Sequence, residues 1–330
     1  IPLVAILTPV RNGAEHLAEA MECVQAQTYP NIVHILIDNN SSDATSDIIA
    51  KFLGQSVPIR SYRNPNLLPL RENWKRSIEM LPAQCAYFMT LCHDDLLMPD
   101  AVECLVSVAA LSKNIGVVGA LWQTGADPNR ELIDCGGGLP TDRNIFDGRW
   151  FIRSYLQQCH NGTSPQCQLF STAVLRDRPL LYSDRFTEYI DIEAMLFACL
   201  HYDYGFVHKH LGFTRNSQTR LTARLAVPEQ LFTKYWLRFI NEFGPEVMSK
   251  DEIETTRQAF LQHYYRRLLI WRYRDRRIDV FNAHNNWLRD NGLAPRMRDY
   301  ARSVASWLLL AASGRRTEVG RHPELISKTW

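Results

Sequence analysis

The chain has 330 residues, of which 46% are hydrophobic and 22% charged, as in an ordinary folded protein. This composition excludes a disordered chain, a collagen-like repeat and a small scaffold held together by disulfides. The formal net charge is only +2, but residues 1–219 carry 17 Lys and Arg against 23 Asp and Glu, whereas residues 220–330 carry 20 against 12. We therefore expect the two parts to meet different partners.

Cysteine usage and hydropathy narrow the class of protein further. All eight cysteines precede residue 200 and none forms a CxxC pair, so we expect reduced thiols in a cytoplasmic protein. No apolar run reaches the ~18–20 residues that a membrane span requires. The first residues lack a charged region followed by a cleavage site, the pattern of a secretory signal.

The first hundred residues alternate between strand and helix patterns. The apolar run 3–10 predicts a strand buried on both faces, and helical spacing follows over 14–27. The same patterns predict further strands at 32–37, 57–63 and 86–91, and helices from 44 and over 71–81. This order is typical of a mainly parallel, Rossmann-like α/β sheet flanked by helices. Ligands bind such sheets at the carboxyl ends of the strands, where we expect Thr8, Asp38 and Asp94.

Later segments carry weaker patterns. Residues 101–110 are helical in pattern, 116–122 strand-like, and 188–199 opens with acids and then becomes apolar, as the start of a helix does. Beyond about residue 228 the periodicity is helical throughout.

Asp94 and Asp95 directly follow the strand predicted at 86–91. Two adjacent carboxylates repel each other unless a cation or hydrogen-bond donors offset their charge. Mg²⁺ or Mn²⁺ bridging a diphosphate is a common solution. The alternative is that Asp95 caps a helix while Asp94 is solvated, and the local motif leaves both interpretations open.

A wider set of motifs bears on that choice. The first 105 residues or so resemble a family 2 glycosyltransferase of the GT-A fold, through residues 4–13, 27–31 and 37–45 and the block from Asp94 to Asp100, all in the family's order and spacing. Weaker matches extend to about residue 220. The resemblance implies a GT-A catalytic domain over 1–222, with a nucleotide-binding half (1–100) and an acceptor half (101–222), and a basic helical region over 223–330.

The resemblance also implies roles for individual residues in donor binding. Asp94 matches the metal-binding Asp of the family's DxD motif, and Asp95 is a second candidate ligand for Mn²⁺ or Mg²⁺. Cys92 replaces the first Asp of that motif, and Asn39 stands where the family usually has Asp. The residues expected to bind the nucleotide-sugar are Thr8, Pro9, Arg11, Asp38, Asn39, Arg71, His93, Asp94 and Arg215.

An inverting transfer also requires a carboxylate that deprotonates the acceptor hydroxyl. The family places an Asp at the start of a helix, and spacing back from Gly205 favours Asp191, with Glu193 second and Glu188 third. These acids alternatively complement only the positive end of the helix. The stretch Arg215–Thr219 resembles the family's loop that closes over the diphosphate. The same residues are equally typical of an ordinary surface loop.

The C-terminal region is basic and amphipathic. Residues 266–277 hold six Arg among apolar and aromatic side chains, and 298–316 is basic at both ends with an apolar middle. Such helices commonly bind an anionic membrane surface, so we expect peripheral contact with the inner face of the cytoplasmic membrane through residues 266–316. A helical cap or an oligomer interface is the alternative. We expect no nucleic-acid partner, because no recognition motif accompanies the charge.

The resulting hypothesis is a metal-assisted, inverting glycosyltransferase. It transfers a sugar from a nucleotide-sugar, with UDP favoured, to a hydroxyl of a lipid-linked or growing cell-surface glycan. Two alternatives stand: an inactive binding or scaffold protein on the same fold, and another nucleotide-sugar enzyme such as a nucleotidyltransferase. The absence of a Gly-rich loop and Lys near the N-terminus disfavours the second alternative.

Overall fold

The computed structural model describes residues 1–216 and 228–312, which divide into two compact units. The first unit comprises residues 1–152 and 160–216, and the second combines 153–159 with the residues from 228 onward. The boundary expected between residues 222 and 223 lies outside the described residues.

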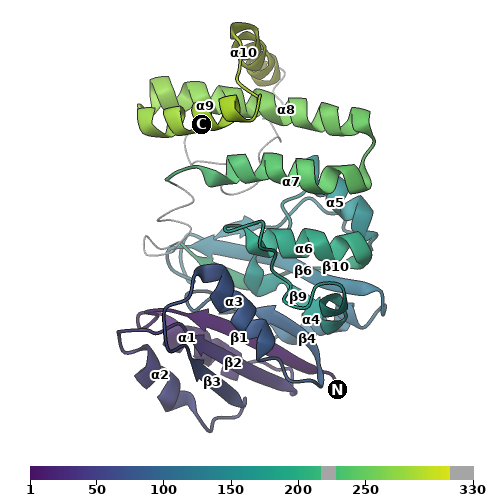
Figure 1. Ribbon diagram of the computed structural model, residues 1–330. Coiled ribbons are helices and arrows are strands. Elements are labelled where there is room, and N and C mark those ends of the chain that lie inside the picture. Colours follow the sequence, from purple (N-terminus) through teal and green to yellow (C-terminus); the bar gives the residue numbers. More distant parts are fainter. Residues whose placement is uncertain (217–227, 313–330) are drawn as a thin grey trace. The chain divides into compact units, whose positions relative to one another are not determined.

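The first unit opens with alternating strands and helices, in the order that the sequence patterns predict (Figure 1). They are β1 (Leu3–Val10), α1 (Leu17–Gln25), β2 (Ile32–Asp38), α2 (Thr45–Phe52), β3 (Ile59–Arg63), α3 (Leu70–Glu79) and β4 (Cys85–Thr90). The first helix begins three residues later than expected. The backbone N–H groups of Gly13 and Ala14 are held instead by the Thr45 hydroxyl and the Asp43 carboxylate of the neighbouring loop.

The rest of the first unit is more irregular. Its elements are β5 (Leu96–Leu97), α4 (Ala101–Ala109), β6 (Ile115–Gly125), β7 (Ile133–Cys135), β8 (Ile145–Phe146), α5 (Gly148–Leu156, which continues into the second unit), η1 (Pro165–Cys167), β9 (Leu169–Ser171), η2 (Thr172–Arg176), α6 (Ile190–His201) and β10 (Asp203–Arg215). The predicted helix at 101–110 and strand at 116–122 are both present.

Within the described residues, the strands form one sheet flanked by helices, in the order β3-β2-β1-β4-β9-β6-β10-β5, with β7 on β6 and β8 on β10. The pairs among β3, β2, β1 and β4 are parallel, as is β6 with β10. The short strand β9 lies antiparallel between β4 and β6 and joins the two parallel groups. The α/β fold class is therefore confirmed, and the antiparallel strands are additions that the sequence patterns did not predict.

The central strands are buried because their residues are apolar on both faces. Val4–Leu7 of β1 and Ile35–Ile37 of β2 are fully shielded from solvent. In the register of the sheet, Val10 at the end of β1 lies beside Asp38 at the end of β2, and Leu7 lies beside Thr90 at the end of β4. The carboxyl ends of these three strands therefore meet at one edge of the sheet.

The second unit is helical. It contains α7 (Leu231–Val247), α8 (Lys250–Leu269), a π-helical turn η4 (Ile270–Arg274), α9 (Ile278–Asp290) and α10 (Met297–Ala312). Ser249 begins α8 with a capping box, in which its hydroxyl accepts from the Glu252 backbone while the Glu252 side chain accepts from the Ser249 backbone. In the described part of the chain, no helix combines the length and the apolar character needed to span a membrane.

The arginines of residues 266–277 do not share one environment. Arg267 is buried, donates to the Gln230 side chain at 2.6 Å, and lies 5.5 Å from the centre of the Trp271 ring. Burial lowers the pKa of the Arg267 guanidinium. Arg272 and Arg274 are exposed. The stretch thus contributes to the core of the helical unit as well as to its surface.

Candidate active site

Two loops meet at the carboxyl ends of β1 and β2. The backbone N–H of Asn12 donates to the Ser41 hydroxyl at 2.9 Å, and the Asn12 side-chain oxygen accepts from the backbone N–H of Ser42 at 2.9 Å. Asn12 and Asn40 adopt left-handed backbone conformations, with φ of 48° and 56°, which Asn tolerates better than most residues. These contacts fix the position of one loop against the other.

The carboxylate of Asp38 organises the second of these loops. It is buried at the end of β2, and one oxygen accepts from the backbone N–H of Ser41 at 2.8 Å. The other oxygen accepts from the Ser46 hydroxyl at 2.9 Å and from Arg63 Nη1 at 2.8 Å. Asp38 therefore holds the loop that a ligand at this edge of the sheet would contact.

Asn39 uses both ends of its amide. Its oxygen accepts from the backbone N–H of Leu68 at 2.9 Å and from Asn64 Nδ2 at 3.0 Å, and its Nδ2 donates to the carbonyl of Leu68 at 2.9 Å. A carboxylate here would accept the first two bonds but has no proton to give to the Leu68 carbonyl. The amide of Asn39 thus supplies a donor that an Asp side chain lacks.

Thr8, Pro9 and Arg11 lie in different environments although they are close in sequence. Thr8 is fully buried, and its hydroxyl lies 2.9 Å from Nε2 of His34 on β2. Burial lowers the pKa of His34 to about 3, so the imidazole is neutral. Pro9 is buried, whereas Arg11 is exposed in the loop after β1. The Thr8 hydroxyl is thus directed at a neighbouring strand.

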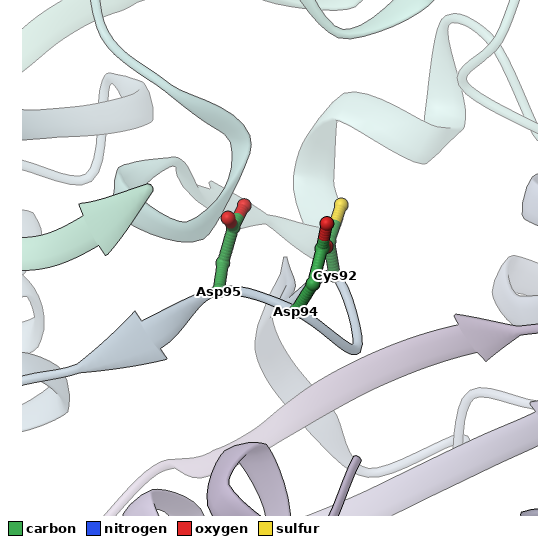
Figure 2. Close-up of side chains that lie close together, drawn as sticks. All are labelled: Cys92, Asp94 and Asp95. Atoms are coloured by element: carbon green, nitrogen blue, oxygen red, sulfur yellow. The ribbon is translucent and has the colours of Figure 1, made fainter. Parts of the chain in front are cut away.

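Three potential ligand groups gather in the loop after β4. One ligand atom from each of Cys92, Asp94 and Asp95 lies within 4.8 Å of the others, and both Asp residues are buried. The backbone N–H of Asp95 donates to the carbonyl of Cys92 at 3.1 Å, which closes the turn. Figure 2 shows the three side chains projecting from this turn in the same direction. Carboxylate and thiolate groups in this arrangement suit a divalent cation.

Arg215, the last residue of β10, packs against this turn and is itself buried. Its backbone N–H donates to Asp95 Oδ1 at 3.2 Å and its Nε donates to the carbonyl of Asp94 at 3.3 Å. Its guanidinium also pairs with the carboxylate of Glu19 on α1. A fixed positive charge therefore lies beside the two Asp residues and partly offsets their charge. The rest of the loop expected at Arg215–Thr219, from Ser217 onward, lies outside the described residues.

His93 links the turn after β4 to the loop after β1. A Cβ atom placed on Gly13 would lie 2.9 Å from Cδ2 of His93 and 2.6 Å from a methyl group of Val10. Only glycine fits in this space without displacing its neighbours. The turn after β4 therefore packs against the loop after β1. Of the residues predicted at three strand ends, Asp38 and Asp94 belong to this edge of the sheet, whereas the Thr8 hydroxyl is directed at His34.

Asp191 lies in the first turn of α6 and is half-buried. Burial raises the pKa of the Tyr182 phenol, and the charge of Asp191 raises it further. The Tyr182 hydroxyl is 3.3 Å from the Thr90 hydroxyl at the end of β4. Tyr182 is thus held beside the strand that leads to the turn at Cys92.

Comparisons with known proteins identify the family to which the first part of the chain is similar. Residues 5–134 match the model of Glycosyl transferase family 2. The chain contains a family 2 glycosyltransferase domain. An uncharacterised glycosyltransferase of Rickettsia typhi is 32% identical over 117 residues, which are 36% of this chain and 35% of that protein. The glycosyltransferase GlyG of Streptococcus pneumoniae is 27% identical over 103 residues, 31% of this chain and 34% of that protein. The match thus spans about a third of the length of these relatives.

Solved structures extend the similarity of fold beyond the family 2 match. TarS 1-349 of S. aureus, solved in complex with UDP-GlcNAc, superposes with a TM-score of 0.63 at 12% identity, over 95% of this chain and 92% of that one. The mannosyltransferase PcManGT of Pyrobaculum calidifontis, in complex with GDP-Man and Mn²⁺, gives a TM-score of 0.54 at 11% identity, over 98% of this chain and 85% of that one. At these identities the likeness establishes the GT-A fold.

Glu193 lies beyond the segment matched by the family 2 model and has a structural partner. Its side chain is fully buried, and both carboxylate oxygens accept from Nη1 of Arg178, at 2.8 and 2.7 Å. Arg178 also donates to the carbonyl of Leu181 at 2.9 Å and covers the ring of Phe197 at 3.5 Å. Burial raises the pKa of Glu193, while the bonds from Arg178 oppose that rise. This pair holds the segment before α6 against the helix.

Arg71 holds the same segment from the other side. From α3 it donates to the carbonyls of Asp184 and Phe186, at 3.0 and 3.2 Å. Lys75, one turn along α3, pairs with the Asp184 carboxylate and thereby lowers the pKa of Asp184. The structure therefore places Arg71 at the segment that leads to Asp191.

Sequence reasoning missed several residues that shape the candidate site. Glu19 occupies an ordinary exposed position on a helix, and nothing in its neighbourhood signals its partner 196 residues away. Arg178 and Tyr182 lie in an irregular stretch without periodicity. Arg63 ends the predicted strand that follows β2. Because parallel strands place their last residues side by side, this position could have identified Arg63 as a neighbour of Asp38.

Proposed function

We propose that the chain is an inverting glycosyltransferase that transfers a sugar from a nucleotide-sugar, UDP-linked by preference, to a hydroxyl of a glycan or lipid-linked glycan. The observation that carries the proposal is the turn of Cys92, Asp94 and Asp95, whose ligand atoms lie within 4.8 Å of one another in the segment that matches family 2. The donors bound in the similar structures, UDP-GlcNAc and GDP-Man, agree with a nucleotide-sugar substrate.

In this proposal the nucleoside lies along the loops after β1 and β2. Pro9, Arg11, Asp38, Asn39 and His93 line that edge of the sheet, where ligands of α/β folds bind. The contacts of Thr8 with His34 and of Arg71 with the segment before α6 give these two residues a positioning role.

The diphosphate of the donor lies at the turn after β4. Asp94 and Asp95 would hold Mn²⁺ or Mg²⁺ there, and such a cation would supply positive charge that offsets the charge of the departing nucleoside diphosphate. The donor set fits this role because the two carboxylates project from one turn together with the Cys92 thiol. Arg215 adds a permanent positive charge at the same place.

Asp191 serves as the general base. It accepts the proton of the acceptor hydroxyl as the hydroxyl oxygen bonds to the anomeric carbon and the bond from that carbon to the diphosphate oxygen breaks. Attack opposite the leaving group inverts the anomeric centre. Glu193, as the partner of Arg178, maintains the start of the helix on which Asp191 stands.

A membrane surface is the proposed partner of the helical unit. On α10, Met297, Val304, Leu308 and Leu309 are exposed, with fractions of 83%, 37%, 53% and 72%, and the exposed residues Arg298 and Arg302 lie among them. Apolar side chains bordered by arginine favour the interface of an anionic bilayer. Sedimentation with anionic and with uncharged vesicles tests this contact, and Leu308→Ser with Leu309→Ser is expected to abolish it.

Thermal unfolding with UDP, GDP, dTDP and CDP, each with and without Mn²⁺, tests the donor site. A nucleotide present at 100-fold its dissociation constant stabilises the fold by about 2.7 kcal/mol. We expect a shift with UDP that grows with Mn²⁺, and loss of only the metal-dependent part in Asp94→Ala. If no nucleotide shifts the unfolding temperature, the donor site is wrong and the inactive scaffold becomes the better account.

A further inference from the structure

The turn that carries Asp94 and Asp95 also presents a thiol. We propose that Cys92 is a ligand of the bound cation, and that the site consequently favours cations that accept sulfur, such as Zn²⁺ and Co²⁺, over Mg²⁺. The inference rests on the proposed function, which supplies the cation and the diphosphate, and it concerns a position where the chain departs from its family.

The geometry of the turn supports a shared ion. Ligand atoms of one tetrahedral Zn²⁺ lie about 2.0–2.3 Å from the metal, so two of them are about 3.3–3.8 Å apart. The Cys92 sulfur and one carboxylate oxygen from each of Asp94 and Asp95 lie within 4.8 Å of one another. The three groups are thus near the separation that one shared ion requires. Figure 2 shows the sulfur projecting on the same side of the turn as both carboxylates.

The chemistry of the donor set then decides the choice of cation. Carboxylates alone suit Mg²⁺ and Mn²⁺, whereas a thiolate selects softer ions such as Zn²⁺. When the ion binds, the sulfur–metal bond replaces the S–H bond and the proton passes to bulk water, without oxidation or reduction.

The charge of the turn explains how a thiol is accommodated here. Asp94 and Asp95 are buried beside Arg215, whose guanidinium is also paired with the carboxylate of Glu19. A third carboxylate at position 92 would add another negative charge to this turn in the absence of metal. A cysteine at this position avoids that third carboxylate.

Binding of Co²⁺ in the presence of UDP tests the proposal without any activity assay. A cobalt ion bound to a thiolate gives a charge-transfer band in the near ultraviolet. We expect this band in the wild type and in Cys159→Ser, which removes an exposed cysteine of the other unit. We expect its loss in Cys92→Ser. A band that persists in Cys92→Ser, or that is absent from the wild type, overturns the proposal.

Cys92→Asp provides a second test that restores a carboxylate. Competition of Zn²⁺ and of Mg²⁺ against bound Mn²⁺ gives the ratio of their affinities. We expect this ratio to fall at least about tenfold in Cys92→Asp. Even a residue that only hydrogen-bonds to a metal ligand typically changes the affinity for the metal by about 10- to 100-fold. An unchanged ratio contradicts the role of the thiol.

The proposed function is checked separately by metal-free binding of UDP to the same proteins. If UDP binds and the cobalt band is absent, only the inference about Cys92 fails. If UDP does not bind to the wild type, the proposed function fails.

Discussion

The guanidinium of Arg215 at the end of β10 is paired with the carboxylate of Glu19 on α1, while its backbone N–H donates to Asp95. Residues 196 positions apart are thus joined at the turn that carries the candidate metal ligands. The arrangement keeps a positive charge at the place where the proposed reaction releases a diphosphate.

Arg215→Ala is expected to lower kcat about 100-fold, the usual effect of removing a fixed donor that stabilises developing negative charge. Arg215→Lys should recover part of this loss, because it keeps the charge but not the forked geometry. Steady-state kinetics with the preferred donor measures both effects.

Glu19→Gln is the matched control for Arg215. Because the Glu19 side chain is half exposed, its ion pair contributes at most about 1 kcal/mol. Activity should therefore stay within about fivefold of the wild type. A loss as large as that of Arg215→Ala would mean that Glu19 itself contacts a substrate.

Asp191→Asn is expected to lower kcat by about 10²–10⁴, the contribution of a positioned general base, and to leave the UDP-induced thermal shift unchanged. Glu188→Gln changes a neighbouring acid of the same segment and should retain activity. If Asp191→Asn instead abolishes the UDP-induced thermal shift, Asp191 belongs to the donor site and is not the base.

Arg178→Ala should destabilise the fold by about 3–5 kcal/mol at neutral pH, because it leaves the carboxylate of Glu193 buried without its partner. Burial already raises the pKa of Glu193 above that of the unfolded chain. Protonation of Glu193 removes the buried charge. The loss of unfolding free energy in Arg178→Ala should therefore shrink as the pH falls toward 5 and grow as the pH rises again. Urea unfolding at pH 5 and pH 7.5 measures this difference.

The double variant Arg178→Ala with Glu193→Gln tests the cause. It removes the buried charge as well as its partner, and should regain part of the stability at neutral pH while losing the pH dependence. A deficit in Arg178→Ala that is the same at both pH values would contradict the assignment to Glu193.

Thr8→Val distinguishes a structural role from a role in binding. The hydroxyl partner of the buried His34 is lost, and an unsatisfied buried group costs about 1–3 kcal/mol. We expect lower stability toward urea with an unchanged dissociation constant for UDP. A weaker UDP complex at unchanged stability would show that the hydroxyl faces the nucleotide.

The sequence predicted the frame of the site because that frame depends on local patterns. Apolar runs located β1, β2 and β4, and polar residues at their ends placed Asp38 and Asp94 at one edge of the sheet. Parallel pairing follows from the alternation of strands and helices, so the meeting of these ends required no knowledge of distant contacts.

The partners of the site residues were not predictable in the same way. Glu193 and Arg178 meet across an irregular segment, and Arg71 binds a carbonyl 113 residues away. Neither contact leaves a periodic or motif-like signal, since both depend on how α6 and α3 pack. The inserted strand β9 is only three residues long, too short for alternation to identify it.

Release of nucleoside diphosphate from a panel of UDP-, GDP- and dTDP-sugars tests the central claim most directly, with a glycan acceptor or with water in its place. We predict that the wild type releases the nucleotide from one donor class in the presence of a divalent cation, and that Asp191→Asn, which still binds the nucleotide, releases it about 10²–10⁴ times more slowly. Nucleotide binding by the wild type without release from any donor under any cation would contradict the account.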